Sequence, residues 1–396
     1  MLRSGLSVYR NAYVGLSPAI WWLSLVMFIN RSGTMVIPFL TLYLTRELGF
    51  SIAEAGIIMG FFGMGAMLGA YLGGWLIDKI GFYKVQIGSL LLNGCMFIVL
   101  GQMRGFWHIA ICIFFLSTLG ESFRPANASA IAHYSKPGNR TRSYSLNRLA
   151  VNLGFSIGPA AGGILASISY DWLFWTDGLT CIIAAVMLRI VMQPPVSPVT
   201  GQNGSSDPIP VKKSAYRDYT YLKFIFLVFL VAFCFLQLFS IVPLYYKEVV
   251  LLNESAIGIL LASNGLLIAV TEMVLVFKLE GKRPDRIYIG TGALLIGLSF
   301  LLLTIHPVIG FVWAAMLMIT LGEMLMFPFV NNFWVSRSTE TNRGQYAALF
   351  TISFALANVM APTIGTQVIK HFGYNALWYL LFSVCGLAAI GFNKLK

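Results

Sequence analysis

The chain has 396 residues, of which 58% are hydrophobic and 11% are charged. Soluble domains carry about 25% charged residues, so this composition excludes an ordinary soluble domain and indicates a membrane protein. The net charge of +12 would fit nucleic-acid binding, but the placement of the charges argues against that partner. The five cysteines and four histidines have no metal-like spacing, so we expect no metal and no cofactor.

Twelve apolar stretches are each long enough to cross a bilayer, which takes about 20 residues. They cover residues 17–44, 53–77, 83–103, 107–133, 143–168, 172–193, 220–246, 255–279, 286–305, 309–335, 344–369 and 374–393. A stretch rich in Pro, Gly and Ser separates the sixth span from the seventh. We therefore predict an all-α membrane protein with two six-helix bundles, at 1–193 and 220–396, joined by a cytoplasmic linker at 194–219.

Lysine and arginine fall mainly on one side of these spans. The side that holds both predicted termini has 20 of the 27, the opposite side has 4, and Arg31, Arg124 and Arg148 lie within spans. Basic loops stay in the cytoplasm, so both termini are predicted to be cytoplasmic. We expect a monomer in the bilayer of a bacterial inner membrane, with no nucleic-acid partner.

A repeat relates the two halves of the chain. Thr118-Leu119-Gly120-Glu121 recurs about 202 residues later as Thr320-Leu321-Gly322-Glu323, and the text that follows each copy is similar as far as Gly163 and Thr366. A repeat of about half the chain length is typical of a duplicated membrane transporter whose site lies between the halves. The two bundles are therefore predicted to be pseudo-symmetric.

The loop after the second span reads GGWLIDKIGFYK. It resembles the motif G-x-x-x-D-[RK]-x-G-[RK]-[RK] of the major facilitator superfamily, although the two residues after its last glycine depart from the pattern. The resemblance implies a twelve-helix transporter whose gate includes these residues. The predicted gating residues are Gly74, Asp78, Lys79, Gly81 and Lys84.

The fifth span reads GFSIGPAAGG at residues 154–163. This stretch is similar to the antiporter motif of the drug:proton exporters of the same superfamily, which implies an exchanger. Close helix packing is the alternative reading, because small residues four apart are frequent in membrane helices. The motif residues are Gly154, Gly158, Pro159, Gly162 and Gly163.

The chain also resembles the proton-coupled oligopeptide transporters of that superfamily. The resemblance rests on the text around Arg31 and on RPANAS at 124–129, but Asn30 stands where that group has a glutamate. This departure weakens the prediction of peptide import.

Charged residues inside the spans are the candidate working groups, because each costs roughly 2.5–3.5 kcal/mol at the bilayer centre. Glu121 and Arg124 lie three apart on one helix face and could be either a self-neutralising pair or part of a site. Arg148 and Asp177 lie nearer span ends, so we expect them at the membrane interface. The predicted substrate-binding residues are Arg31, Arg124, Asn30, Asn331 and Asn332, in a cavity lined by spans one, four, seven and ten.

Glu323 has no basic residue within one helical turn. A lone carboxylate in lipid favours its neutral, protonated form, which is the condition for carrying a proton. We predict Glu323 as the proton-coupling residue, followed by Glu272 and Glu121. A hydrogen bond from Asn331, Asn332 or another helix is the structural alternative for Glu323.

No nucleotide-binding loop occurs, so we expect an ion gradient to drive transport and no enzyme activity. The predicted function is a proton-coupled antiporter that exports an amphipathic or anionic small molecule by alternating access. The alternatives are a proton-coupled symporter that imports a peptide or an organic anion, and a receptor or scaffold that transports nothing.

Overall fold

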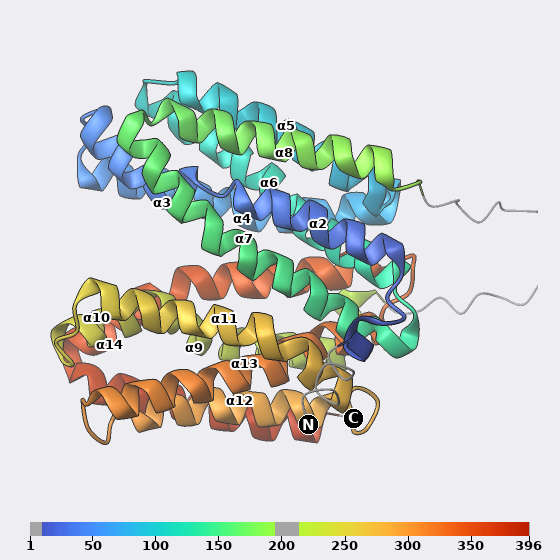
Figure 1. The fold of residues 1–396 in the computed structure, drawn as a ribbon, viewed down its shortest axis with the longest axis vertical. Helices are drawn as coiled ribbons and strands as arrows, with labels where there is room; N and C mark the ends of the chain where they lie inside the picture. Colours follow the sequence, from blue (N-terminus) through green and yellow to red (C-terminus); the bar gives the residue numbers. More distant parts are fainter. Residues whose placement is uncertain (1–9, 195–213, 396) are drawn as a thin grey trace, which may run out of the picture.

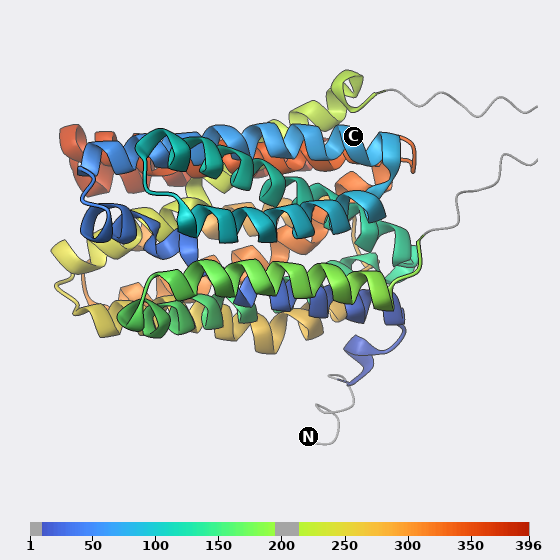
Figure 2. The ribbon, with the colours of Figure 1, turned by 90° about the horizontal axis from the view of Figure 1, so that it is seen from above.

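The computed structural model describes residues 10–194 and 214–395, so most of the predicted linker lies outside the described residues. Two helical bundles lie one above the other in Figure 1, and their helices run roughly along one direction in both views (Figures 1 and 2). The N-terminal half contains α2 (Pro18–Ser32), α3 (Val36–Leu42), a π-helical turn (Tyr43–Glu47), α4 (Ile52–Ile80), α5 (Phe82–Gln102), α6 (Phe106–Tyr134), α7 (Arg140–Ile168) and α8 (Asp171–Val191). The C-terminal half contains α9 (Tyr219–Ser240), α10 (Val242–Glu248), α11 (Glu254–Leu279), α12 (Asp285–Leu302), α13 (Ile309–Arg337) and α14 (Arg343–Lys394).

Among the described residues, 11 helical segments are long and apolar enough to cross a membrane. The last of them, α14, has 52 residues but contains Gly373, whose φ of 78° and ψ of 173° are not helical. A 52-residue helix would be about 78 Å long, more than twice the hydrocarbon thickness of about 30 Å. The turn at Gly373 therefore divides α14 into two spans, and the predicted count of twelve is confirmed.

The first span of the N-terminal half is broken, which the sequence reading did not anticipate. Helix α2 ends at Ser32 and α3 begins at Val36. Pro38 favours a break at this position, because a proline ring in a continuous helix clashes with the carbonyl four residues earlier. That carbonyl belongs to Thr34, so the helix is interrupted between Gly33 and Met35.

The glycines of the predicted antiporter motif in α7 pack against this break. A Cβ atom on Gly154 would lie 2.5 Å from the Cβ of Arg31, and one on Gly158 would lie 2.9 Å from the carbonyl oxygen of Thr34. Gly162 packs in the same way on Met35, at 3.0 Å from its Cβ. The small residues thus let α7 approach the backbone of the first span, as the close-packing interpretation requires; the side chain of Pro159 lies outside the described residues.

The two halves meet along α4 and the first part of α14, and along α7 with α11 and α13. The backbone N–H of Gly344 donates to Oδ1 of Asp78 at 2.8 Å, and Arg142 Nε lies 3.0 Å from Glu280 Oε2. His133 Nδ1 lies 3.3 Å from Glu340 Oε1. These contacts gather at the predicted cytoplasmic end, so the bundles are tied together there.

Replacing Gly158 by alanine is expected to destabilise the protein. The added methyl group would clash with the carbonyl oxygens of Thr34 and Arg31, 2.9 and 3.2 Å away. Overpacking of this kind costs about 1–3 kcal/mol, which outweighs the helix propensity gained from alanine. The measurement is the apparent melting temperature of the purified protein in detergent.

The matched control is Gly163→Ala, because the nearest atom to its added Cβ is Cζ of Phe39 at an ordinary 3.6 Å. This variant should melt at or slightly above the wild-type temperature. Equal melting temperatures for the two variants would contradict the packing described here.

Candidate functional site

A cavity of about 300 Å³ lies between the two halves. Its walls come from α2, α6 and α7 on one side and from α13 and α14 on the other. We call it the central cavity; its polar and aromatic lining residues include Arg31, Arg124, Asn127, Tyr144, Asn147, Arg148, Asn152, Phe155, Glu323, Phe327, Asn331, Phe350, Thr351 and Phe354. Spans one, four and ten contribute as predicted, but the seventh span, α9, supplies none of the described lining residues. Spans five and eleven take part instead.

The expectation that Glu323 is a lone carboxylate is wrong. Arg148 Nη2 lies 2.8 Å from Glu323 Oε1, and Arg148 Nε lies 3.3 Å from Glu272 Oε2. Nδ2 of Asn264 donates to Glu323 Oε2 at 3.0 Å. Arg148 therefore joins α7 of one half to α11 and α13 of the other. The prediction that Arg148 lies at the membrane interface is wrong.

We call Arg148, Glu272 and Glu323 the Arg148 cluster. Its three side chains are 15%, 2% and 8% exposed, so they are almost removed from water. Neither carboxylate oxygen of Glu272 has a hydrogen-bond partner of good geometry. Two carboxylates and one guanidinium leave one negative charge, which a low-dielectric environment disfavours unless a further cation or proton is supplied.

Glu121 and Arg124 form the ion pair that their spacing predicts, with Arg124 Nε 3.2 Å from Glu121 Oε2. Arg31 lines the central cavity and lies over the ring of Phe155, with Cζ 5.5 Å from the ring centroid. Among the described residues, Arg31 has no ion pair, and its Nε is buried without a hydrogen-bond partner. Arg31 is thus the cavity cation most available to an anionic or acceptor-rich group.

The three predicted asparagines lie in different places. Asn331 lines the central cavity, but its amide nitrogen donates to the carbonyl of Phe327 in its own helix. Asn332 points away from the cavity, because its Nδ2 donates to Asp285 Oδ2 at 2.6 Å near the predicted cytoplasmic end. Neither Asn331 nor Asn332 donates to Glu323. The amide that does so belongs to Asn264. Asn30 lies in the N-terminal half, with Nδ2 3.4 Å from the Cys181 sulfur.

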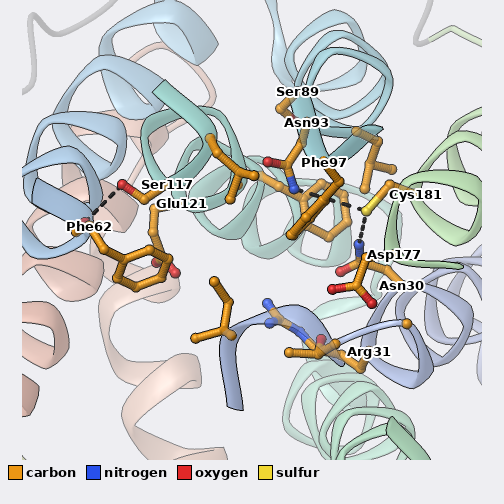
Figure 3. Close-up of a pocket in the computed structure, with 17 residues that line it drawn as sticks. Asn30, Arg31, Phe62, Ser89, Asn93, Phe97, Ser117, Glu121, Asp177 and Cys181 are labelled. Atoms are coloured by element: carbon orange, nitrogen blue, oxygen red, sulfur yellow. Dashed lines mark hydrogen bonds between the residues drawn. The ribbon is translucent and has the colours of Figure 1, made fainter. Parts of the chain in front are cut away.

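A smaller cavity of about 90 Å³ lies inside the N-terminal half, on the other side of Arg31 (Figure 3). Asn30, Asn93, Glu121 and Asp177 line it. Asp177 is 1% exposed, so the expectation that it lies at the membrane interface is wrong. We call this space the N-terminal pocket.

A series of hydrogen-bonded amide side chains, not predicted from the sequence, reaches the central cavity through α5, α6 and α7. Gln86 Nε2 donates to Asn127 Oδ1 at 3.2 Å, and Asn127 Nδ2 donates to Asn147 Oδ1 at 3.1 Å. Uncharged amides within apolar spans were the available signal, because a polar group in lipid needs a partner.

The family model described as Major Facilitator Superfamily matches residues 20–362, with a second match at 252–395. The chain belongs to the Major Facilitator Superfamily. It is 25% identical to a "Na(+), Li(+), K(+)/H(+) antiporter" of Planococcus maritimus over 91% of both chains. It is 21% identical to the quinolone resistance protein NorA of Staphylococcus aureus, over 83% of this chain and 84% of NorA.

Solved structures share the fold. The human organic anion transporter MFSD10 (TETRAN) superposes with a TM-score of 0.77 at 15% identity, covering 95% of this chain and 100% of its own. A bacterial homologue of the iron transporter ferroportin, in an outward-facing state with soaked iron, gives a TM-score of 0.72 at 16% identity, covering 95% and 98%. The chain is therefore a multi-pass integral membrane protein with the superfamily fold.

In this superfamily member, the predicted gating residues divide into those that bridge the halves and those that do not. Asp78 bridges to Gly344, and the backbones of Gly74 and Gly344 pack with no space for a side chain between them. Lys79 lies over the Trp75 ring of its own helix, 4.0 Å from the centroid, and Lys84 is exposed. Gly81 makes the expected tight turn with a φ of 85°.

Removing the guanidinium of the Arg148 cluster is expected to destabilise the protein strongly. Arg148→Met leaves Glu272 and Glu323 buried without their cation, which costs roughly 3–5 kcal/mol for a broken buried pair. The apparent melting temperature in detergent should fall accordingly.

Adding Glu272→Gln and Glu323→Gln to Arg148→Met should restore most of the lost melting temperature, because no uncompensated charge remains. A triple variant no more stable than Arg148→Met would show that packing of the arginine, and not charge balance, is what matters at this position.

Proposed function

We propose that this secondary transporter is a proton-coupled antiporter that exports an amphipathic or anionic small molecule by alternating access. The observation that carries the proposal is the Arg148 cluster, a buried set of ionisable groups that joins the two halves at the wall of the central cavity. Its position links two events that an antiporter must couple, namely the loading of a proton and the relative movement of the bundles.

The coupling step follows from the ion pairs. A proton on Glu323 removes the charge that holds Arg148 Nη2. The guanidinium then keeps the 3.3 Å contact to Glu272 and a long hydrogen bond of 3.5 Å from Nη1 to the backbone carbonyl of Glu323. The attraction between α7 and α13 weakens, which favours separation of the bundles at their tied end. Release of the proton on the other side restores the pair and resets the contact.

The central cavity fits an organic substrate with an anionic or acceptor-rich group. Arg31 offers an unpaired guanidinium, and Phe155, Phe327 and Phe354 provide apolar walls. NorA, named for quinolone resistance, and the antiporter of Planococcus maritimus support exchange rather than import. A quinolone such as norfloxacin, which has a carboxylate on an aromatic body, is therefore a suitable probe.

We further propose a monomer in the bacterial cytoplasmic membrane, with both termini in the cytoplasm.

Glu323→Gln is expected to abolish gradient-driven accumulation of norfloxacin while sparing counterflow, because glutamine cannot take up or release the proton. In proteoliposomes an antiporter accumulates the probe when the lumen is acidic, whereas a symporter does so when the medium is acidic. Fluorescence of the trapped probe reports both the direction and the extent.

Glu47→Gln is the matched control, since this carboxyl is exposed and lies at the predicted outer end, away from the tied end of the bundles. It should leave accumulation within about twofold of wild type. Full accumulation by Glu323→Gln would refute the coupling role, and accumulation driven only by an acidic medium would refute antiport.

A second candidate function is exchange of a monovalent cation for protons at the same cluster. The specific observation is the cluster's net charge of −1. Glu272 and Glu323 share the single cation Arg148, and one alkali ion would neutralise the charge that remains. The name of the Planococcus maritimus relative includes such ions.

Cation exchange predicts that alkali salts stabilise the protein. At pH 8, NaCl, LiCl or KCl should raise the apparent melting temperature above that in N-methyl-D-glucamine chloride of equal ionic strength. Binding at ten times the Kd contributes about 1.4 kcal/mol. Glu272→Gln should remove this difference and Glu47→Gln should keep it; equal melting temperatures in all four salts would argue against the second candidate.

A further inference from the structure

The break in the first span has a partner on α8. The carboxylate of Asp177 accepts hydrogen bonds from the backbone N–H of Met35, 3.0 and 3.2 Å from its two oxygens, and from that of Val36 at 2.9 Å. The interruption before α3 leaves both amides without a helical partner. The Met35 N–H also donates to the carbonyl oxygen of Gly33 at 2.9 Å, whereas the acceptor of the Val36 N–H is Asp177. Asp177 therefore satisfies the broken backbone from outside the span.

Both oxygens of Asp177 take part in this contact, because Oδ2 accepts from Val36 and from Met35, and Oδ1 accepts from Met35 at the shorter distance of 3.0 Å. An asparagine of the same size has a single acceptor oxygen, and its amide nitrogen would face a donor. Asp177 has no ion pair among the described residues, so backbone N–H groups are the donors that hold its buried carboxyl group. The Asp177 carboxylate therefore has a hydrogen-bonding role that an uncharged side chain of the same size would fill only in part.

The opposite side of the break is fixed by α7. Gly154 abuts Arg31, and Gly158 abuts the carbonyl of Thr34, at the distances given above. The segment from Arg31 to Val36 is thus clamped between the Asp177 carboxylate and the α7 glycines. In Figure 3, Asp177 and Arg31 lie at the same side of the N-terminal pocket, and the guanidinium points into it.

We infer that Asp177 is a positioning residue for substrate binding: it holds the break in the first span so that the Arg31 guanidinium stands at the wall shared by the central cavity and the N-terminal pocket. This role rests on the proposed function, because it assumes that Arg31 binds the anionic group of the substrate. Asp177 lines the N-terminal pocket but not the central cavity, so it acts on substrate in that cavity through Arg31.

The test compares Asp177→Asn with wild type in proteoliposomes, using norfloxacin as the probe. Leaving a buried backbone N–H without its acceptor changes an equilibrium constant by about tenfold. Here that constant is the one between the positioned and the displaced Arg31 guanidinium. The concentration for half-maximal transport should therefore rise about tenfold, while the maximal rate stays within about twofold because the Arg148 cluster is untouched. Hydrogen exchange of peptides covering Met35 and Val36 should also quicken.

Two further variants separate positioning from simple stability. Arg31→Gln combined with Asp177→Asn should bind no more weakly than Arg31→Gln alone, since Asp177 has nothing left to position. Asp171→Asn on the same helix is the control, because the Asp171 side chain is 63% exposed and its ion pair with Arg104 is long, at 4.0 Å. This variant should leave the half-saturation concentration and the maximal rate unchanged. Asp177→Glu, which keeps both oxygens and the charge, serves where Asp177→Asn does not fold and should weaken binding less.

Each outcome decides the question. An unchanged half-saturation concentration in Asp177→Asn, or effects of Arg31→Gln and Asp177→Asn that add, overturns the role of Asp177 and leaves the proposed function standing. Absence of norfloxacin transport by the wild-type protein overturns the proposed substrate class and, with it, this role.

Discussion

One guanidinium shared between two carboxylates of the opposite half is the interaction on which the arrangement depends. Arg148 reaches from α7 to Glu272 on α11 and Glu323 on α13, where little water screens the charges. Such a contact is strong when complete and costly when one charge is lost. The addition of one proton to either carboxylate would therefore change the attraction between the bundles, which is the property that the proposed coupling requires.

The break in the first span places a second set of charged groups. Pro38 disfavours a continuous helix, and Asp177 and the α7 glycines contact the interrupted backbone from two sides. Arg31 consequently stands between the central cavity and the N-terminal pocket, without a counter-ion among the described residues. A charge left unpaired at the wall of a cavity is suited to an exchangeable partner, whereas the paired Arg124 is already neutralised by Glu121.

Predictions that depend on neighbours in the sequence were confirmed. The twelve spans and the turn at Gly81 follow from hydropathy and glycine geometry. Helical spacing left the pairing of Glu121 with Arg124 as one of two alternatives, and the structure contains this ion pair. The assignment of Arg148 and Asp177 to the membrane interface was wrong, because distance from a span end says nothing about which neighbouring helix covers a side chain. The partner of Glu323 was missed for a related reason, since Arg148 is 175 residues away in the chain.

The sequence alone determined the superfamily fold and which spans contain charges. In lipid each helix satisfies its own backbone, so spans are set by local composition. Only the tertiary structure decided which charges meet and which remain open. Ion pairing between halves depends on the rotation and tilt of helices that are far apart in the chain, and neither quantity is encoded in the composition of any one span.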